Sequence, residues 1–182
     1  MNPISYWQRL KVAFQYVMPQ IYMTQAAGWL AKQKWGAVTH FVIKAFARKY
    51  NIDMSIAEKE KFSDYASFNE FFIRPLKGNA RPINQNPTAL CCPADGRVSE
   101  CGHIEDDRLL QAKGHFFSLN DLLAEDKDLT ETFKNGEFVT TYLSPRDYHR
   151  VHMPCDGTLR KMIYVPGDLF SVNPFLAKHV PN

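Results

Sequence analysis

The spacing of apolar residues changes along the 182-residue chain, and this change constrains its fold more than any other feature. In the first fifty residues, apolar side chains recur at helical intervals, as in the series Trp7, Leu10 and Phe14. After about residue 88, short apolar or alternating runs are separated by turn residues, which is typical of strands. The sequence therefore predicts an α+β fold, in which amphipathic N-terminal helices precede a β-rich, mostly antiparallel domain.

Charge is unevenly distributed along the chain. Residues 1–50 contain seven Lys and Arg residues and no Asp or Glu, although the whole chain has a formal net charge of only +3. All three tryptophans (Trp7, Trp29 and Trp35) lie in this region, and tryptophan rings favour the headgroup zone of a bilayer. We therefore expect residues 1–50 to bind an anionic membrane surface. A helical bundle that packs on the rest of the protein, with its basic face in water, stays open as the alternative. No nucleic acid is expected as a partner, because the charges are not gathered on one reading helix.

The apolar and cysteine content bounds the compartment. The uncharged residues between Lys11 and Lys32 are long enough to span a membrane, but Pro19 and several glutamines interrupt them. Neither a spanning helix nor a cleaved signal peptide is therefore expected. The four cysteines include no Cys-x-x-Cys pair, so we expect reduced cytosolic thiols rather than disulfides.

Caps and breakers predict the limits of the helices. Helices are expected over residues 5–18, 21–32 and 35–50, where Pro19 ends the first. Ser67 is expected to cap a short helix that begins at Phe68, with Glu70 completing a capping box.

Turn residues predict the strands that follow. Strands are expected after the turn Asp95-Gly96, after a hairpin turn at 134–137, and after the turn Asp156-Gly157, with one helix over 119–125. We place the domain boundary after the charged connector. Residues 1–66 then form a basic helical, membrane-associating segment, and residues 67–182 form the β-rich catalytic domain.

The segment "YLSPRDYHRVHMPCDG" (142–157) concentrates reactive side chains. His149 and His152 are spaced as a metal pair, but a zinc site needs further ligands, and the prolines argue against a helix that presents both rings. Ser144 or Cys155 as a nucleophile is a second reading, although no glycine elbow marks either residue. In the third reading, a histidine acts as a general base that is oriented by a carboxylate such as Asp95 in "PADG". The residues alone leave these readings open, and we expect no metal.

Five collinear motifs carry a resemblance to a known family. They are "FNEFFIRPL" (68–76), "PADG" (93–96), "QAKGH" (111–115), "TTYLSPRDYHRVHMPCDG" (140–157) and "YVPGDLFSVNP" (164–174). With them, the chain resembles the bacterial phosphatidylserine decarboxylase proenzymes along nearly its whole length. The resemblance implies conversion of phosphatidylserine to phosphatidylethanolamine with release of carbon dioxide.

The resemblance also implies the cofactor and the roles of three residues. Members of the family cleave themselves at a serine, which becomes a pyruvoyl group and serves as the electron sink for decarboxylation. Asp95 and His152 match the aspartate and histidine of an Asp-His-Ser triad for self-cleavage. His149 matches the histidine that assists decarboxylation near the pyruvoyl group. Arg146, Tyr148 and Arg150 lie in the same motif and receive no role.

The sequence departs from the family pattern in one place. No Leu-Gly-Ser-Thr motif, which would supply the pyruvoyl group, occurs in the 182 residues. The resemblance therefore implies that this chain corresponds to the N-terminal part of the β chain, which needs a pyruvoyl-bearing α chain and is inactive alone. A non-catalytic, membrane-binding remnant of the enzyme is the alternative. The family further implies a peripheral protein on the cytoplasmic face of the bacterial inner membrane, with αβ units that pair as a homodimer.

Overall fold

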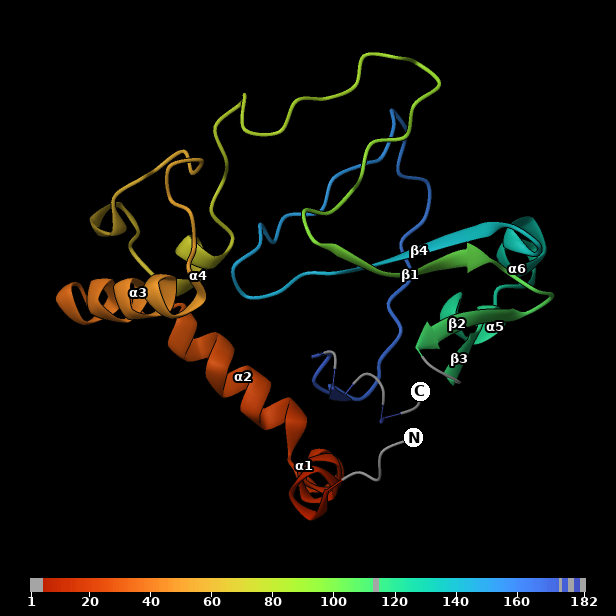
Figure 1. Ribbon diagram of the computed structural model, residues 1–182, viewed down its shortest axis with the longest axis horizontal. Coiled ribbons are helices and arrows are strands. Elements are labelled where there is room, and N and C mark those ends of the chain that lie inside the picture. The colour runs from red at the N-terminus through yellow and green to blue at the C-terminus, as the bar shows by residue number, and fades with distance from the viewer. Residues whose placement is uncertain (1–4, 113–114, 174, 177–178, 181–182) are drawn as a thin grey trace. The chain divides into compact units, whose positions relative to one another are not determined.

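The computed structural model describes residues 5–112, 115–173, 175–176 and 179–180, and Figure 1 shows the order of their elements. Helices α1 to α4 precede the strands, and two short helices lie among the strands, which confirms the predicted α+β class. The chain forms two compact units: residues 25–97 with 142–160, and residues 1–24 with 98–141 and 161–182. The motif "QAKGH" lies partly outside the described residues, and the domain boundary after residue 66 stays a prediction.

Three helices occupy the first fifty residues, close to the predicted limits: α1 (Tyr6–Val17), α2 (Gln20–Ala31) and α3 (Ala37–Tyr50). Ser5 begins α1 with a capping box, in which the Gln8 amide donates to the Ser5 hydroxyl and the Ser5 amide donates to the Gln8 side chain. Pro19 separates α1 from α2. No residue that the structure describes in α1 or α2 is buried. Within the same part of the chain, no helix is long and apolar enough to cross a membrane.

Helix α3 buries a different face from its most apolar stripe. Its buried residues are Thr39, Ile43 and Ala47, whereas Phe41 is 72% exposed. The i, i+4 pair Ile43 and Ala47 packs against Tyr65 and Phe71, and the partly buried Phe46 ring covers the edge of this core. Val38, Phe41 and Val42 stay exposed.

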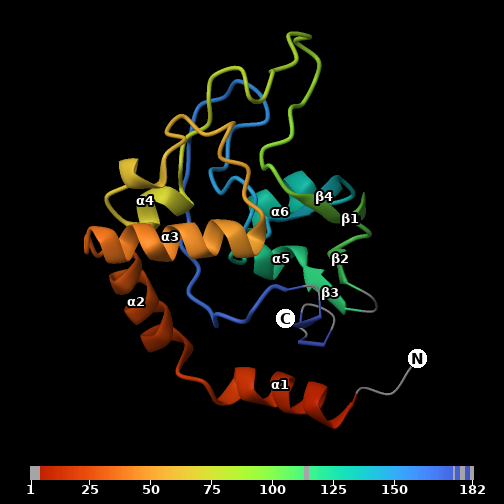
Figure 2. The same ribbon diagram turned by 60° about the vertical axis from the view of Figure 1, so that its left-hand side comes forward.

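Helix α4 (Phe68–Phe72) lies beside α3, as Figures 1 and 2 both show. The Ser67 hydroxyl accepts from the Glu70 amide at 3.1 Å, as its cap position predicts. The Glu70 carboxylate accepts from the Lys59 ammonium and from the Ala66 amide, and these bonds hold the pKa of Glu70 below its usual value. The predicted capping box is therefore only half formed, because Glu70 accepts from the Ala66 amide and not from the Ser67 amide. Phe71 is fully buried between Ile43, Ala47 and Tyr65, which anchors α4 in this core.

The other unit contains nearly all of the described strands. Strands β1 (Arg97–His103) and β4 (Glu137–Tyr142) pair, and β2 (Arg108–Ala112) pairs antiparallel with β3 (His115–Ser118). Helices α5 (Leu119–Leu122) and α6 (Lys127–Phe133) follow, where Ser118 and Asp126 are the N-caps. A second core forms from Ile104, Leu109 and Leu119.

Two predictions in the β-rich part of the chain were wrong. The turn at 134–137 joins α6 to β4 and is not a hairpin turn, because the preceding residues form a helix that Asp126 caps. Residues 158–165 form no strand: Leu159, Met162 and Tyr164 are all at least 80% exposed, and no strand lies beside them in the part of the chain that the structure describes. An alternating pattern becomes a strand only where another strand supplies its hydrogen bonds.

Replacing Phe71 by Ala should lower the free energy of unfolding of this core by about 3–5 kcal/mol. The Phe71 ring is fully buried, and both aromatic rings and aliphatic side chains surround it. Urea unfolding followed by circular dichroism would measure the change. Phe41→Ala is the matched control on the exposed side of α3 and should shift stability by less than about 0.5 kcal/mol. Equal losses for the two variants would contradict the assignment of the core.

Candidate active site

Two segments far apart in the sequence run antiparallel and form the site. The Cys91 amide donates to the Pro154 carbonyl and the His152 amide donates to the Pro93 carbonyl, both at 2.8 Å. An isolated antiparallel bridge joins Asp95 to Tyr148 further along. This pairing places the motif "PADG" directly beside the two-histidine motif, within one compact unit.

Tyr148 is the direct partner of His152. The Tyr148 hydroxyl and His152 Nε2 are 2.9 Å apart, and the two rings stack with centroids 5.5 Å apart and planes inclined by 21°. Tyr148 is buried, whereas His152 is exposed. A buried phenol therefore lies against an accessible imidazole and holds it through Nε2.

Asp95 is held by Arg81. Arg81 Nε donates to Asp95 Oδ1 at 3.1 Å and Arg81 Nη2 donates to Oδ2 at 2.6 Å, a bidentate pair. These bonds raise the pKa of Arg81. No hydrogen bond between the Asp95 carboxylate and the His152 ring is present among the described residues. A carboxylate can accept about four hydrogen bonds, so the pair with Arg81 leaves Asp95 able to accept from an imidazole as well.

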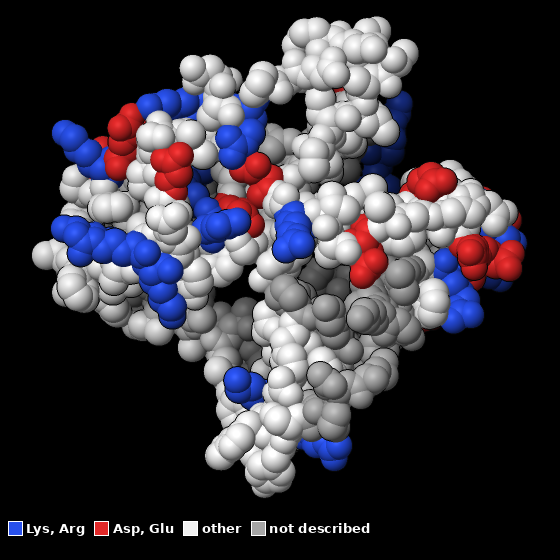
Figure 3. Space-filling view, viewed as in Figure 1, with Lys and Arg blue, Asp and Glu red and all other residues white. Residues whose placement is uncertain are grey.

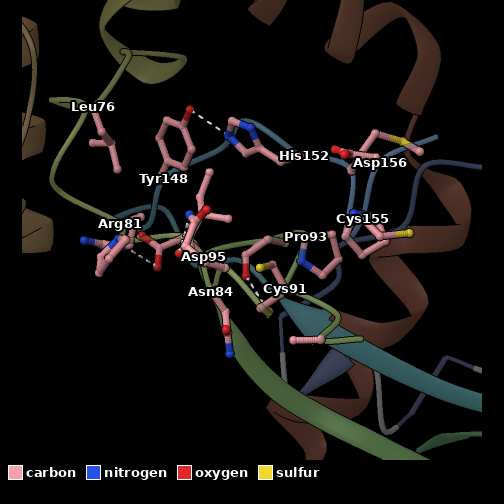
Figure 4. Close-up of a pocket in the computed structure, with 18 of the residues that line it drawn as sticks. Leu76, Arg81, Asn84, Cys91, Pro93, Asp95, Tyr148, His152, Cys155 and Asp156 are labelled. Atoms are coloured by element: carbon pink, nitrogen blue, oxygen red, sulfur yellow. Dashed lines mark hydrogen bonds and ion pairs between the residues drawn. The ribbon is translucent and has the colours of Figure 1, made fainter. Parts of the chain in front are cut away.

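One open cavity of about 1040 Å³ collects these groups. Figure 4 shows the Tyr148 hydroxyl directed at the His152 ring, with the Arg81–Asp95 pair beside them. Cys91 and Cys155 lie further along the same wall. A base, a carboxylate and a phenol that share one accessible cavity can orient and deprotonate a hydroxyl group that enters it.

His149 lies apart from that cavity wall. Its ring stacks on Phe72 of α4, with centroids 4.2 Å apart and planes inclined by 26°. Its Nε2 is 3.0 Å from the Ser144 carbonyl. The structure therefore brings Asp95 and His152 to one cavity and places His149 against the end of α4.

In the part of the chain that it describes, the structure gives no contact that supports Ser144 or Cys155 as a nucleophile, or a metal site in this motif. The Ser144 hydroxyl donates to Asp147 Oδ2 at 2.7 Å, and the Asp147 carboxylate also accepts from the Ser144 amide at 2.6 Å, so Ser144 closes a turn. Cys155 is a free, exposed thiol. Among the residues that the structure describes, no cluster of three His, Cys, Asp or Glu side chains could hold a metal ion.

Sequence reasoning missed Arg81 and left Tyr148 without a role. No local pattern marks Arg81, because its link to Asp95 crosses fourteen positions of irregular chain. Tyr148 lies four positions before His152 in the same motif, but no regular pattern marks its pairing with that histidine.

Comparison with known proteins identifies the family. The model of the phosphatidylserine decarboxylase family matches residues 68–182, and a second model, described as PSD, matches residues 10–51. The chain belongs to the phosphatidylserine decarboxylase family.

Individual relatives agree with this assignment. The chain is 88% identical, over its full length, to the phosphatidylserine decarboxylase proenzyme of Haemophilus influenzae, and spans 63% of that protein. It is 79% identical over 98% of its length to the proenzyme of Pasteurella multocida, and spans 61% of it. A Histophilus somni proenzyme is 75% identical over 98% of the chain.

Removing the Tyr148 hydroxyl should make His152 more reactive. In Tyr148→Phe, the ring is retained but Nε2 of His152 loses its partner, so carbethoxylation of His152 by diethyl pyrocarbonate should accelerate roughly 2- to 12-fold, the equivalent of one hydrogen bond of about 0.5–1.5 kcal/mol. Peptide mapping would follow the modification. Tyr164→Phe, at an exposed ring, should leave the rate unchanged. An unchanged rate at His152 in Tyr148→Phe would remove this bond from the site.

Proposed function

We propose that the protein from which this chain comes is a pyruvoyl-dependent decarboxylase that converts phosphatidylserine to phosphatidylethanolamine and carbon dioxide. Membership of the phosphatidylserine decarboxylase family supports this proposal. The observation that carries it is the convergence of Asp95 and His152 on one accessible cavity. The names of the relatives favour the enzyme over a non-catalytic remnant, since they describe proenzymes.

Asp95 and His152 would serve self-cleavage of the proenzyme. The Tyr148 hydroxyl holds the His152 ring through Nε2, and a serine that enters the cavity and displaces this hydroxyl could give its proton to that nitrogen. Asp95 would accept from the other imidazole nitrogen and stabilise the imidazolium that forms. The accessible surface of His152 fits this role, because a base must meet a hydroxyl that is supplied from another segment.

A pyruvoyl group supplies an electron sink for decarboxylation when it is present. This chain holds no Leu-Gly-Ser-Thr motif, so the donor serine would lie in the part of the proenzyme that becomes the α chain after cleavage. The open cavity, with polar groups on its wall, fits a segment that enters from outside. His149 would hold or deliver a proton at the reacting carbon of the substrate after carbon dioxide leaves. The pairing of two αβ units as a homodimer stays a prediction.

Residues 1–50 would hold the protein on the anionic cytoplasmic face of the inner membrane. Helices α1 and α2 bury no described residue, and Trp7, Trp29 and Trp35 are each more than half exposed. Figure 3 shows basic side chains gathered over the region of α3, whose last turn contributes Arg48 and Lys49. Exposed aromatic rings and basic side chains together suit a headgroup layer.

Variants of the full-length protein should separate self-cleavage from turnover. Asp95→Ala and His152→Ala should leave the proenzyme uncleaved, because the base or its orienting carboxylate is lost. His149→Ala should cleave normally and decarboxylate about 10²- to 10⁴-fold more slowly, the usual contribution of a positioned acid or base. Gel mobility reports cleavage, and release of carbon dioxide from phosphatidylserine reports turnover.

Two controls accompany these variants. Asp156→Ala removes a carboxylate from the same cavity, and His103→Ala removes a histidine paired with Glu137 in β4. Both should cleave and decarboxylate like the wild type. Normal cleavage in Asp95→Ala or His152→Ala, or full turnover in His149→Ala, would overturn the corresponding assignment.

Anionic vesicles should bind the protein through the basic residues of α3. Replacing Lys44, Arg48 and Lys49 by Gln should weaken binding to phosphatidylglycerol vesicles by roughly 10²-fold, at about 1 kcal/mol per basic residue near the surface. Sedimentation with vesicles at low and high salt would test this, since salt should weaken binding of the wild type. The same change at exposed Arg97, Lys127 and Arg160 is the control. Salt-independent binding, or an equal loss in the control, would contradict membrane contact through α3.

A further inference from the structure

We propose that Arg74 and Arg150 are positioning residues that hold the segment 144–150 on the end of α4 and so orient His149 for its proton transfer. This inference rests on the proposed role of His149. Neither arginine is suggested here to touch the substrate or the reacting atoms. Their effect passes through the main chain on either side of the histidine.

The two arginines make reciprocal bonds between the same two segments. Arg74 Nη2 donates to the Arg146 carbonyl at 3.1 Å, and Arg150 Nε donates to the Ile73 carbonyl at 2.7 Å. Consecutive residues after α4 therefore exchange one bond in each direction with a loop more than seventy positions away. Two bonds at different points fix both the distance between residues 73–74 and the loop 146–150 and their register along each other. One bond alone would leave the register free.

Burial of the Arg74 guanidinium lowers the stability of the fold. The side chain is only 2% exposed, and its Nε and Nη1 have no hydrogen-bond partner among the described residues. Burial lowers the pKa of Arg74, while the nearby Asp147 and Asp95 charges oppose that shift, so the guanidinium stays protonated. The Phe71 ring lies 5.4 Å from its central carbon and offers a further weak attraction. Because an apolar side chain of similar volume often replaces a buried charge without loss of stability, Arg74 is better explained by position than by stability.

His149 sits between the parts that the two arginines bring together. One face of its ring stacks on Phe72, the last residue of α4 and the neighbour of Ile73. Its Nε2 meets the Ser144 carbonyl, at the start of the clamped segment. A carbonyl only accepts, so Nε2 must carry the proton, and Nδ1 is then the nitrogen that can exchange a proton with substrate. Sliding the loop against α4 would separate the ring from Phe72 or from Ser144, and would change which nitrogen is presented.

The turn itself is rigid enough to transmit this constraint. The Asp147 amide donates to the Ser144 carbonyl at 2.9 Å, and the Asp147 carboxylate accepts from both the amide and the hydroxyl of Ser144. The Arg146 carbonyl that Arg74 holds lies inside this turn. Fixing that carbonyl therefore fixes Ser144, and through it the acceptor of His149.

The test uses Arg74→Met and Arg150→Met in the full-length protein. Each variant should keep wild-type self-cleavage and a similar thermal midpoint, while kcat for decarboxylation falls about 10- to 100-fold with KM nearly unchanged, as expected for a catalytic group that is misplaced by about 1 Å. The double variant should lose little more than either single one, because both arginines hold the same loop. Arg74→Lys should recover part of the rate, since an ammonium can still donate to the Arg146 carbonyl.

Arg146→Met is the matched control. It removes an exposed side chain that makes a long ion pair with Asp147 Oδ1 at 3.6 Å, whereas the Ser144 bonds use Asp147 Oδ2 and the Arg74 bond uses only the Arg146 main-chain carbonyl. The turn and the clamp should therefore remain, and kcat should stay at the wild-type value. Imidazole ¹⁵N spectra should show the proton of His149 on Nε2 in the wild type and a mixture of tautomers in Arg74→Met.

The outcomes separate this inference from the proposed function. Wild-type kcat in both methionine variants, or a proton on Nδ1 of His149 in the wild type, would overturn the clamp while leaving the decarboxylase assignment intact. A fall in kcat that adds fully in the double variant would also overturn it. A wild-type protein without decarboxylase activity would instead overturn the proposed function. Should Arg74→Met fail to fold, the exposed Arg150 still allows the comparison.

Discussion

Two main-chain hydrogen bonds, from the Cys91 amide to Pro154 and from the His152 amide to Pro93, determine where the reactive side chains of this protein stand. They join an aspartate-bearing turn to a histidine-bearing loop sixty positions along the chain, and neither segment is part of a regular sheet. Both acceptors are proline carbonyls, and proline has no amide proton to donate, so the pairing stays short and local. The site therefore depends on irregular backbone that is held by few contacts, and α4 must supply the support that a sheet would provide elsewhere.

That support comes from a small aromatic core. Phe71 anchors α4 among Ile43, Ala47 and Tyr65, and the chain that leaves α4 carries Ile73 and Arg74 to the histidine loop. The aromatic core therefore positions the end of α4, the end of α4 positions the loop 144–150, and this loop positions the His149 ring. A substitution in the core or at the end of α4 would affect the proposed reaction only by moving the His149 ring. A substitution at His149 or His152 would remove the proposed proton-transfer group itself.

The sequence predicted the helices better than the strands, for a physical reason. Caps such as Ser5 and Ser67 act within four residues, so the limits of α1 and α4 can be read locally. The partner of a strand is remote, and the alternating run at 158–165 gave no sign that it would lie exposed. The site followed the same division. Asp95, His149 and His152 were proposed as site residues because motifs carry them, while the bonds of Arg74 and Arg81 cross long separations and have no local signature.

The exposure of α1 and α2 has a consequence for how this region behaves. Each helix has twelve residues, and an isolated helix of that length is marginal in water because nucleation is costly. With no buried residue among those described, tertiary packing adds little, so folding of these helices and coverage of their apolar side chains become one coupled step. The conformational entropy that the helices lose on ordering then weakens the binding of this region to any surface. If this region binds a membrane as proposed, substitutions that only raise helix propensity, at exposed positions of α1 and α2, would strengthen its binding without changing a contact.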